Sequence, residues 1–335
     1  SNFVNGSGNY SKLKYYIVPL TFAAIFHQYA HLITKAWIKR IVFWLLALSA
    51  FSSFVGIIQI LFHYNIVKLE VDTYSRNQGA LMGGAMYYSY PIAIICSMTL
   101  AAIVHFKKFR EYLDFRLLLI TLIINFVGLY YSYTRGAMLA FIASLPFIVY
   151  YTHKKIFITT LAAGMLLAGF IGYIVIGKAD VNFYRFRANN ASDSYRLSLF
   201  QSAIQMFKEK PVFGYGLRNF EHECVRIQDE QDIKPRFCDA VHSHNQLLDS
   251  LANSGVIGTI PYVLFFGLWL LIYLKGSSTL FLFSLPGYVT YLAITLTDTP
   301  LYISPVCSII FILYGLLFIQ KEKVDFWTIS LSNHK

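Results

Sequence analysis

Long apolar runs make up most of the chain, and the polar residues gather in the junctions between them. A helix that crosses the hydrocarbon core of a bilayer needs about 20 mostly apolar residues. Runs of this kind lie near residues 14–30, 41–62, 80–105, 115–132, 136–151 (short for a span), 156–176, 256–274, 279–297 and 302–320. They lack strand alternation, and a backbone in lipid must satisfy its own hydrogen bonds. The pattern predicts an all-α, polytopic transmembrane helical bundle with about nine spans in this chain.

The longest polar interruption covers residues 177–255, where charges of both signs are mixed. It is too long for a simple turn, so we expect a large extramembrane loop with helices of its own. Its piece "SDSYRLSLFQSAIQMFKEKPVFGYG" predicts an amphipathic helix at the membrane interface, capped by Ser192 or Asp193 and ended by Pro211. The apolar residues at helical spacing in this piece are Leu197, Phe200, Ile204 and Phe207.

The loop ends in "VHSHNQLLDSLANSGVIGT", residues 241–259. Leu247, Leu248 and Leu251 form one apolar face of a further helix, and "ANSG" at 252–255 is expected to stop that helix before the next span. The chain contains no internal repeat, so residues 1–335 are interpreted as a single integral membrane domain that carries its active site on the 177–255 loop.

Composition and charge agree with a membrane protein. The chain is 56% hydrophobic and 13% charged, with a net charge of +11. Most Lys and Arg residues stand at span ends, where positive charge sets membrane orientation, so we do not expect a nucleic-acid partner. The inner junctions are "HLITKAWIKR", "HFKKFREYLDFR", "THKK", "LKGSS" and "QKEK". The outward junctions are then 63–79, 131–135, 177–255 and 298–301.

This alternation places the beginning of the chain outside the membrane, although the sequence shows neither an initiator Met nor a signal peptide. We therefore expect the chain to be a fragment of a larger protein that has additional spans before it.

The four cysteines fall into two groups. Cys96 and Cys307 lie inside spans and are interpreted as packing residues. Cys224 and Cys238 share the outer loop, where an oxidising periplasm would allow a disulfide between them. Two unpaired thiols are the alternative.

Arginines at the outward side are the first candidates for chemistry. Arg135, in "SYTRGAML", stands between two apolar runs, and a charge at such a position is by default a functional hypothesis. The alternative is that Arg135 reaches the outer headgroups. Arginine forks match phosphate oxygens, so Arg135 and Arg196 together would suit a lipid-linked diphosphate. For Arg196 alone, an ordinary contact with interfacial lipid is the alternative.

Histidines near residue 244 are the second candidates. His244 is expected in the first turn of the helix that follows, with Ser243 as its cap. The positive end of the helix dipole disfavours imidazolium, which leaves a neutral imidazole able to act as a general base. His242 is expected to point elsewhere as a structural residue. Asn245 either orients the histidine or a sugar, or caps the helix.

A metal site is not expected. His222, Cys224, Cys238, His242 and His244 are the residue types that zinc prefers, but they lack tight ligand spacing, and "HQYAH" at 27–31 lacks its usual acidic partner. The outer acids Glu70, Asp72 and Asp298 stand in no recognisable magnesium motif.

Three segments resemble bacterial O-antigen ligases. They are "SYTRGAML", "RLSLFQSAIQMFKEKPVFGYG" and "HNQLLDSLANSGVIGT", which follow one another in the family's order between about residues 130 and 260. The last segment, with His-Asn followed by Gly-x-x-Gly-Thr, is the most specific. The other two are shared with O-antigen polymerases and with protein O-oligosaccharyltransferases.

The resemblance implies a GT-C-type membrane glycosyltransferase of about twelve spans in the bacterial inner membrane. Such enzymes transfer a glycan from undecaprenyl diphosphate to the lipid A–core oligosaccharide at the periplasmic face, without metal or cofactor and with inversion at the anomeric carbon. By the same resemblance His244 is the essential histidine, and Arg135 and Arg196 hold the diphosphate. Arg218 and Arg76 match less well, as further substrate contacts.

Three other functions stay open on the sequence alone. A polymerase would use a second lipid-linked repeat unit as acceptor, and a protein O-oligosaccharyltransferase would use a protein hydroxyl. A transporter for the lipid-linked glycan would need polar residues through the depth of several spans. The polar residues here crowd at one face, which favours an enzyme that works at that surface.

Overall fold

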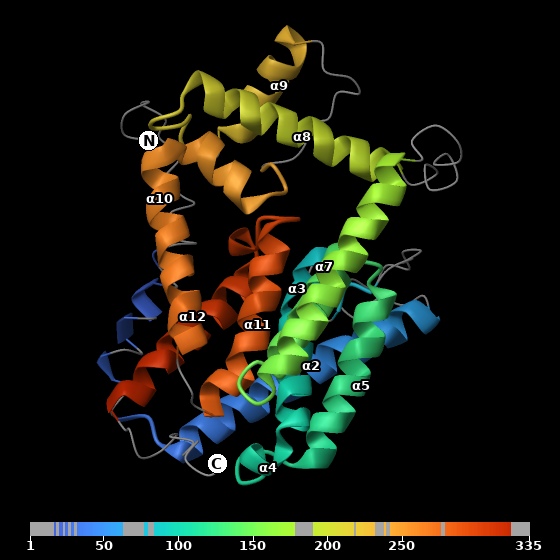
Figure 1. Ribbon diagram of the computed structural model, residues 1–335, viewed down its shortest axis with the longest axis vertical. Helices are drawn as coiled ribbons and strands as arrows, with labels where there is room; N and C mark the ends of the chain where they lie inside the picture. Colours follow the sequence, from blue (N-terminus) through green and yellow to red (C-terminus); the bar gives the residue numbers. More distant parts are fainter. Residues whose placement is uncertain are drawn as a thin grey trace. The chain divides into compact units, whose positions relative to one another are not determined.

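The computed structural model describes residues 17, 20–22, 24, 25, 28, 29, 32–62, 77–79, 84–177, 190–217, 219–231, 238, 242–275 and 279–322. These residues form helices and connecting turns without a β-strand, as Figure 1 shows, so the prediction of an all-α fold is confirmed. The long apolar helices are α2 (Lys35–Phe62), α3 (Ala85–Val104), α5 (Phe115–Tyr131), α6 (Arg135–Ile148), α7 (Lys154–Gly177), α10 (Gln246–Lys275), α11 (Thr279–Thr295) and α12 (Ser304–Glu322).

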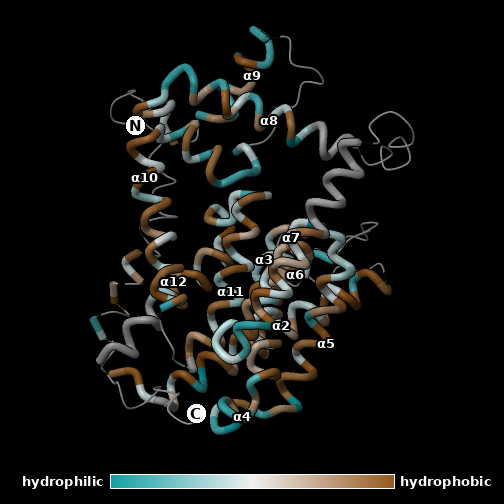
Figure 2. The backbone as a smooth tube through the Cα atoms, viewed as in Figure 1, coloured by the Kyte–Doolittle hydropathy of each residue, from teal (hydrophilic) through white to brown (hydrophobic). Residues whose placement is uncertain are grey.

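Eight of the expected apolar runs each coincide with one of these helices, and the run at 14–30 falls largely outside the described residues. Within the described parts, α2, α3 and α10 are long and apolar enough to cross a membrane, and α5, α6, α11 and the first half of α12 are shorter apolar helices. Figure 2 shows the hydrophobic residues along α5 and hydrophilic residues at α9. The protein is a multi-pass membrane helical bundle.

The chain divides into two compact units. The first, called the loop unit here, has its described residues within Lys155–Leu268 and Thr295–Thr299. The second, the bundle unit, has them within Tyr15–Lys154, Trp269–Ile294 and Pro300–Lys335. The expectation of a single integral membrane domain stays a prediction.

In the bundle unit, α3 is the most deeply buried helix, and α2, α5 and α6 pack on it or on one another. Asp114 accepts hydrogen bonds from the backbone N–H groups of Arg116 and Leu117, and so caps α5. The short helix α4 (Phe106–Phe109) and the 3₁₀ turn η4 (Pro300–Tyr302) complete the described part of this unit.

A buried amide and three hydroxyl groups join α2, α3 and α5. Ser53 donates to Asn125 Oδ1 at 2.7 Å, Asn125 Nδ2 donates to Ser49 at 2.9 Å, and the Tyr88 hydroxyl donates to Ser53 at 2.8 Å. All four side chains are buried. Hydrogen bonds of this kind hold helices together where apolar surface alone gives no preference for a partner helix.

The loop unit is built around two helices, α8 (Asn190–Glu209) and α9 (Phe220–Glu230). Cys224 and Cys238 form a disulfide that ties α9 to the chain leading toward His242. The core of this unit consists of Leu199, Ala203, Met206, Tyr215, Phe220, Cys224, Ile227 and Ala252.

The predicted cap of α8 was wrong, and the structure also shows which face of this helix is exposed. The helix begins at Asn190, so Ser192 and Asp193 lie inside its first turn and are not its cap. Several cap-forming residues stand in a row there, and the sequence does not choose between them. The expected apolar face is exposed at Leu197 and Ile204, whereas Leu199, Ala203 and Met206 on the other side are buried. An interfacial position for the exposed face stays a prediction.

The predicted break at "ANSG" is confirmed. Gly255 has a φ of 60° and interrupts α10 with a kink. The segment after α8 docks there backbone to backbone: the N–H of Val256 donates to the carbonyl of Pro211 at 2.8 Å, and the N–H of Gly216 donates to Asn253 at 2.8 Å. A Cβ at Gly255 would stand 2.3 Å from the Val212 carbonyl oxygen, so only glycine fits. This close approach fixes the start of α10 on the core of the loop unit.

Candidate active site

The turn that leads into α10 is held by Asn245. Its Oδ1 accepts hydrogen bonds from the N–H groups of Leu247 and Leu248 at 3.1 and 3.0 Å, and its Nδ2 donates to the Leu296 carbonyl at 2.9 Å. Asn245 is therefore the helix cap, and the expectation that Ser243 caps the helix was wrong. Asn and Ser are similarly good caps, and only the second bond of the Asn245 amide, to residues after α11, decides between them.

His244 lies immediately before the cap and not in the first helical turn, which corrects the expectation. Its backbone φ is 53°, in the left-handed region that a residue with a side chain enters at a cost of about 1–2 kcal/mol. Such backbone strain is concentrated at functional sites because the surrounding structure must hold it in place.

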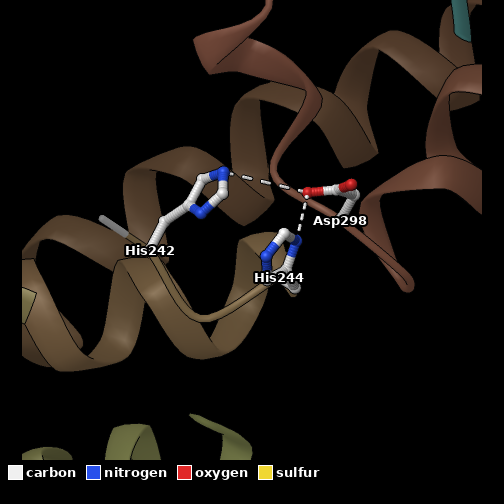
Figure 3. A group of neighbouring side chains, drawn as sticks. All are labelled: His242, His244 and Asp298. Carbon is white, nitrogen blue, oxygen red and sulfur yellow. Dashed lines mark hydrogen bonds and ion pairs between the residues drawn. The ribbon is translucent and has the colours of Figure 1, made fainter. Parts of the chain in front are cut away.

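The carboxylate of Asp298 contacts the ring of His244, as Figure 3 shows. The His244 Nδ1 lies 3.1 Å from Asp298 Oδ1, and the backbone N–H of Thr299 donates to the same oxygen at 2.8 Å. The Asp298 side chain is 2% exposed and that of His244 is 13% exposed. Because an ionised carboxylate only accepts, we assign the shared proton to Nδ1 of His244, which in the neutral ring leaves the lone pair on Nε2. A nitrogen with this lone pair can take a proton from a bound hydroxyl.

His242 lies beside this pair, although the sequence suggested that it points elsewhere. Its ring centroid is 4.6 Å from that of His244, and its Nε2 is 3.9 Å from Asp298 Oδ1. Burial lowers the pKa of His242, and the charge of Asp298 only partly offsets this effect. Both histidines precede α10, and the sequence does not reveal the left-handed backbone conformation of His244.

Asp298 is the residue beside His244 that the sequence did not single out. It was one of three outer acids without a motif, and it follows α11 by only a few residues. The order of the apolar runs along the chain could have pointed to Asp298. The apolar runs at 256–274 and 279–297 follow one another closely in the sequence, so a pair of antiparallel spans could be expected to bring the start of the first and the end of the second to the same side.

Arg196 belongs to the same unit as His244. It is half-buried in α8 and follows Tyr195, whose ring centroid is 5.9 Å from that of His244. Arg196 therefore stands on the helix whose Tyr195 ring lies near His244.

Arg135 is the exposed first residue of α6, in the bundle unit. The positive end of the α6 dipole adds to its charge. Convergence of Arg135 with Arg196 stays a prediction.

Arg218 and Arg76 lie outside the described residues, as do Glu70 and Asp72. The five zinc-type residues of the loop do not assemble into one site. Cys224 and Cys238 are joined to each other, and the His222 side chain is 86% exposed beside Glu223.

Within the described parts of the chain, one group of metal-ligand type does assemble. It consists of His242, His244 and Asp298.

Comparison with known proteins agrees with the resemblance seen in the sequence. Residues 119–263 match the family model of the O-antigen ligases, and this segment contains Arg135, Arg196 and His244. No curated protein matches the chain. The family match supports a membrane enzyme of the O-antigen ligase or polymerase type in lipopolysaccharide biosynthesis.

Proposed function

We propose that the protein is an O-antigen ligase, which transfers a glycan from undecaprenyl diphosphate to the lipid A–core oligosaccharide at the periplasmic face of the bacterial inner membrane. The observation that carries this proposal is the hydrogen bond between His244 and Asp298 at the kinked, capped entrance of α10. It supplies a histidine in the tautomer of a general base, on a segment that matches the O-antigen ligase family.

In this mechanism His244 Nε2 removes the proton from the acceptor sugar's hydroxyl. The hydroxyl oxygen attacks the anomeric carbon of the donor from the face opposite the diphosphate. The bond between that carbon and the diphosphate oxygen breaks, so the configuration inverts. Asp298 stabilises the imidazolium that forms and keeps Nδ1 protonated, as the acid does in other histidine-based sites.

Arg135 and Arg196 are proposed to hold the diphosphate. Negative charge builds on the leaving diphosphate in the transition state, and fixed guanidinium groups stabilise that charge more than they stabilise the ground state. With two cations in this role, transfer needs no divalent metal, and EDTA should leave the activity intact. Inhibition by EDTA that a divalent ion reverses would contradict this part of the proposal.

The test uses purified full chain with an undecaprenyl-diphosphate glycan, with lipid A–core added to one reaction and no second acceptor to the other. Products are read by gel and mass spectrometry. Glycan on lipid A–core supports the ligase. Longer lipid-linked chains in the acceptor-free reaction would make the protein a polymerase with the same catalytic residues, and absence of product in both would contradict glycan transfer to either acceptor.

A further inference from the structure

Three potential metal ligands converge at the site. His242 Nε2 and His244 Nδ1 both face Asp298 Oδ1, at 3.9 and 3.1 Å, and one ligand atom from each residue lies within 4.8 Å of the others. The general base uses only two of these residues. His242 adds a third potential ligand, and the proposed proton abstraction by His244 does not require it.

The donor set matches a particular class of ion. Zinc binds imidazole nitrogen and carboxylate oxygen at about 2.0–2.2 Å, so the ligand atoms of a tetrahedral site stand about 3.3 Å apart. The observed separations need only small side-chain rotations to reach that value. Two nitrogen ligands disfavour magnesium and calcium, which bind almost entirely through oxygen.

We propose that His242, His244 and Asp298 bind a divalent transition-metal ion of the zinc type, and that the ion switches glycan transfer off. The inhibition rests on the proposed role of His244 as general base. The binding itself does not.

The inhibition follows from the two ring nitrogens of His244. Without the ion, Nδ1 carries the proton that Asp298 accepts, and the lone pair of Nε2 is available. With the ion, the Nδ1 lone pair bonds to the metal, so the proton of the neutral ring moves to Nε2. A protonated Nε2 donates and cannot accept the proton of the acceptor hydroxyl. No proton is gained or lost by the ring, and no redox step is involved.

Binding is tested first, on tag-free full chain in detergent after treatment with EDTA. Co²⁺ is the probe, because its visible absorption reports nitrogen and oxygen coordination, and Zn²⁺ is then added as competitor. We expect the wild-type protein to show one Co²⁺ site that His242→Ala weakens by at least about tenfold, since loss of an outer-shell group alone costs about 10–100-fold in metal affinity. His242→Gln serves as a second variant if the alanine protein is unstable.

His222→Ala is the matched control. This histidine belongs to the same outer loop, but its side chain is exposed on α9, so its loss should leave the Co²⁺ site unchanged. Equal Co²⁺ binding by the wild type and His242→Ala would overturn the proposed site, and so would loss of the site in His222→Ala.

Activity is tested second. Zn²⁺ should inhibit the wild type and EDTA should restore it, whereas the activity left in His242→Ala should not respond to Zn²⁺ at the same concentration. Inhibition of both proteins alike would overturn the switch. Failure of the proposed function has a different signature: full turnover of His244→Ala would remove the base, while the Co²⁺ spectrum would still report the metal site.

Discussion

Two groups of polar side chains, one buried among α2, α3 and α5 and one at the entrance of α10, differ in their chemistry. Between α2, α3 and α5, the amide of Asn125 and the hydroxyls of Ser49, Ser53 and Tyr88 are neutral and bond to one another. At the entrance of α10, His244 and Asp298 combine an acidic group, a left-handed backbone and a ring nitrogen whose lone pair is not used in their mutual bond.

The comparison distinguishes buried polar groups that stabilise the fold from a buried group that orients a reactive side chain. In a neutral cluster, the hydrogen bonds between helices offset the cost of removing the polar groups from water. Removing such a side chain should therefore lower the stability of the fold. Burial of a carboxylate is unfavourable for stability, but here it fixes the tautomer of the histidine. Removing this carboxylate should therefore lower the turnover. Substitutions in the two clusters should therefore affect different measurements.

The largest effect is expected from His244→Ala. Removal of a general base costs typically about 10²–10⁴-fold in rate, and kcat should fall while donor binding persists. The measurement is turnover of glycan transfer, with a thermal unfolding curve beside it. Because alanine tolerates the left-handed backbone poorly, His244→Asn is the companion variant. Near-normal turnover of either protein would remove the base assignment.

Asp298→Asn should have the second largest effect. The amide can donate toward Nδ1, which favours the tautomer with the proton on Nε2, and the analogous change in serine proteases costs about 10⁴-fold in kcat. We expect about 10²–10⁴-fold here, read from kcat with KM measured in parallel. A change confined to the melting temperature would make Asp298 a purely structural residue like Asn125.

Arg135→Lys and Arg196→Lys should each lower kcat/KM by about 10–100-fold, nearly as much as the alanine variants. Lysine keeps the charge but loses the fork, and a hydrogen bond to a charged group contributes about 1.5–3 kcal/mol. The steady-state rates of all four variants decide this. Almost full activity of the lysine proteins would show that simple charge is sufficient.

Asn125→Leu should have the smallest effect on activity and a measurable one on stability. It leaves Ser49 and Ser53 without their amide partner, at a cost of about 1–2 kcal/mol. The midpoint of thermal unfolding should fall while turnover per folded molecule stays unchanged. Ile123→Leu, on the exposed side of the same helix, is the control. A loss of turnover in Asn125→Leu without a loss of stability would contradict the purely structural role of this cluster.

The general fold could be predicted from the sequence because lipid imposes simple rules. Long apolar runs must be helices, and the structure has helices at the expected runs that it describes. The break at Gly255 was also predictable, since glycine after a polar "ANS" ends a helical pattern.

Details of the site were less predictable, for two physical reasons. His242 was misplaced because both histidines lie before the helix, where the divergence of residues two apart in a helical turn does not apply. Nothing in "VHSHNQ" specifies the φ of 53° at His244. Asp298 was not paired with His244 because their contact joins residues 54 apart in sequence. Tertiary contacts of this range follow from helix packing, which a local pattern does not encode.

The most direct measurement of the central claim is the turnover of four proteins: the wild type, His244→Ala, Asp298→Asn and the double variant. If Asp298 acts only through the imidazole of His244, the two losses are not additive, and the double variant is no slower than His244→Ala. The expected result is two single variants that are each strongly impaired and a double variant equal to the slower one. Multiplying losses, or normal turnover of His244→Ala, would contradict a histidine–carboxylate pair as the catalytic base.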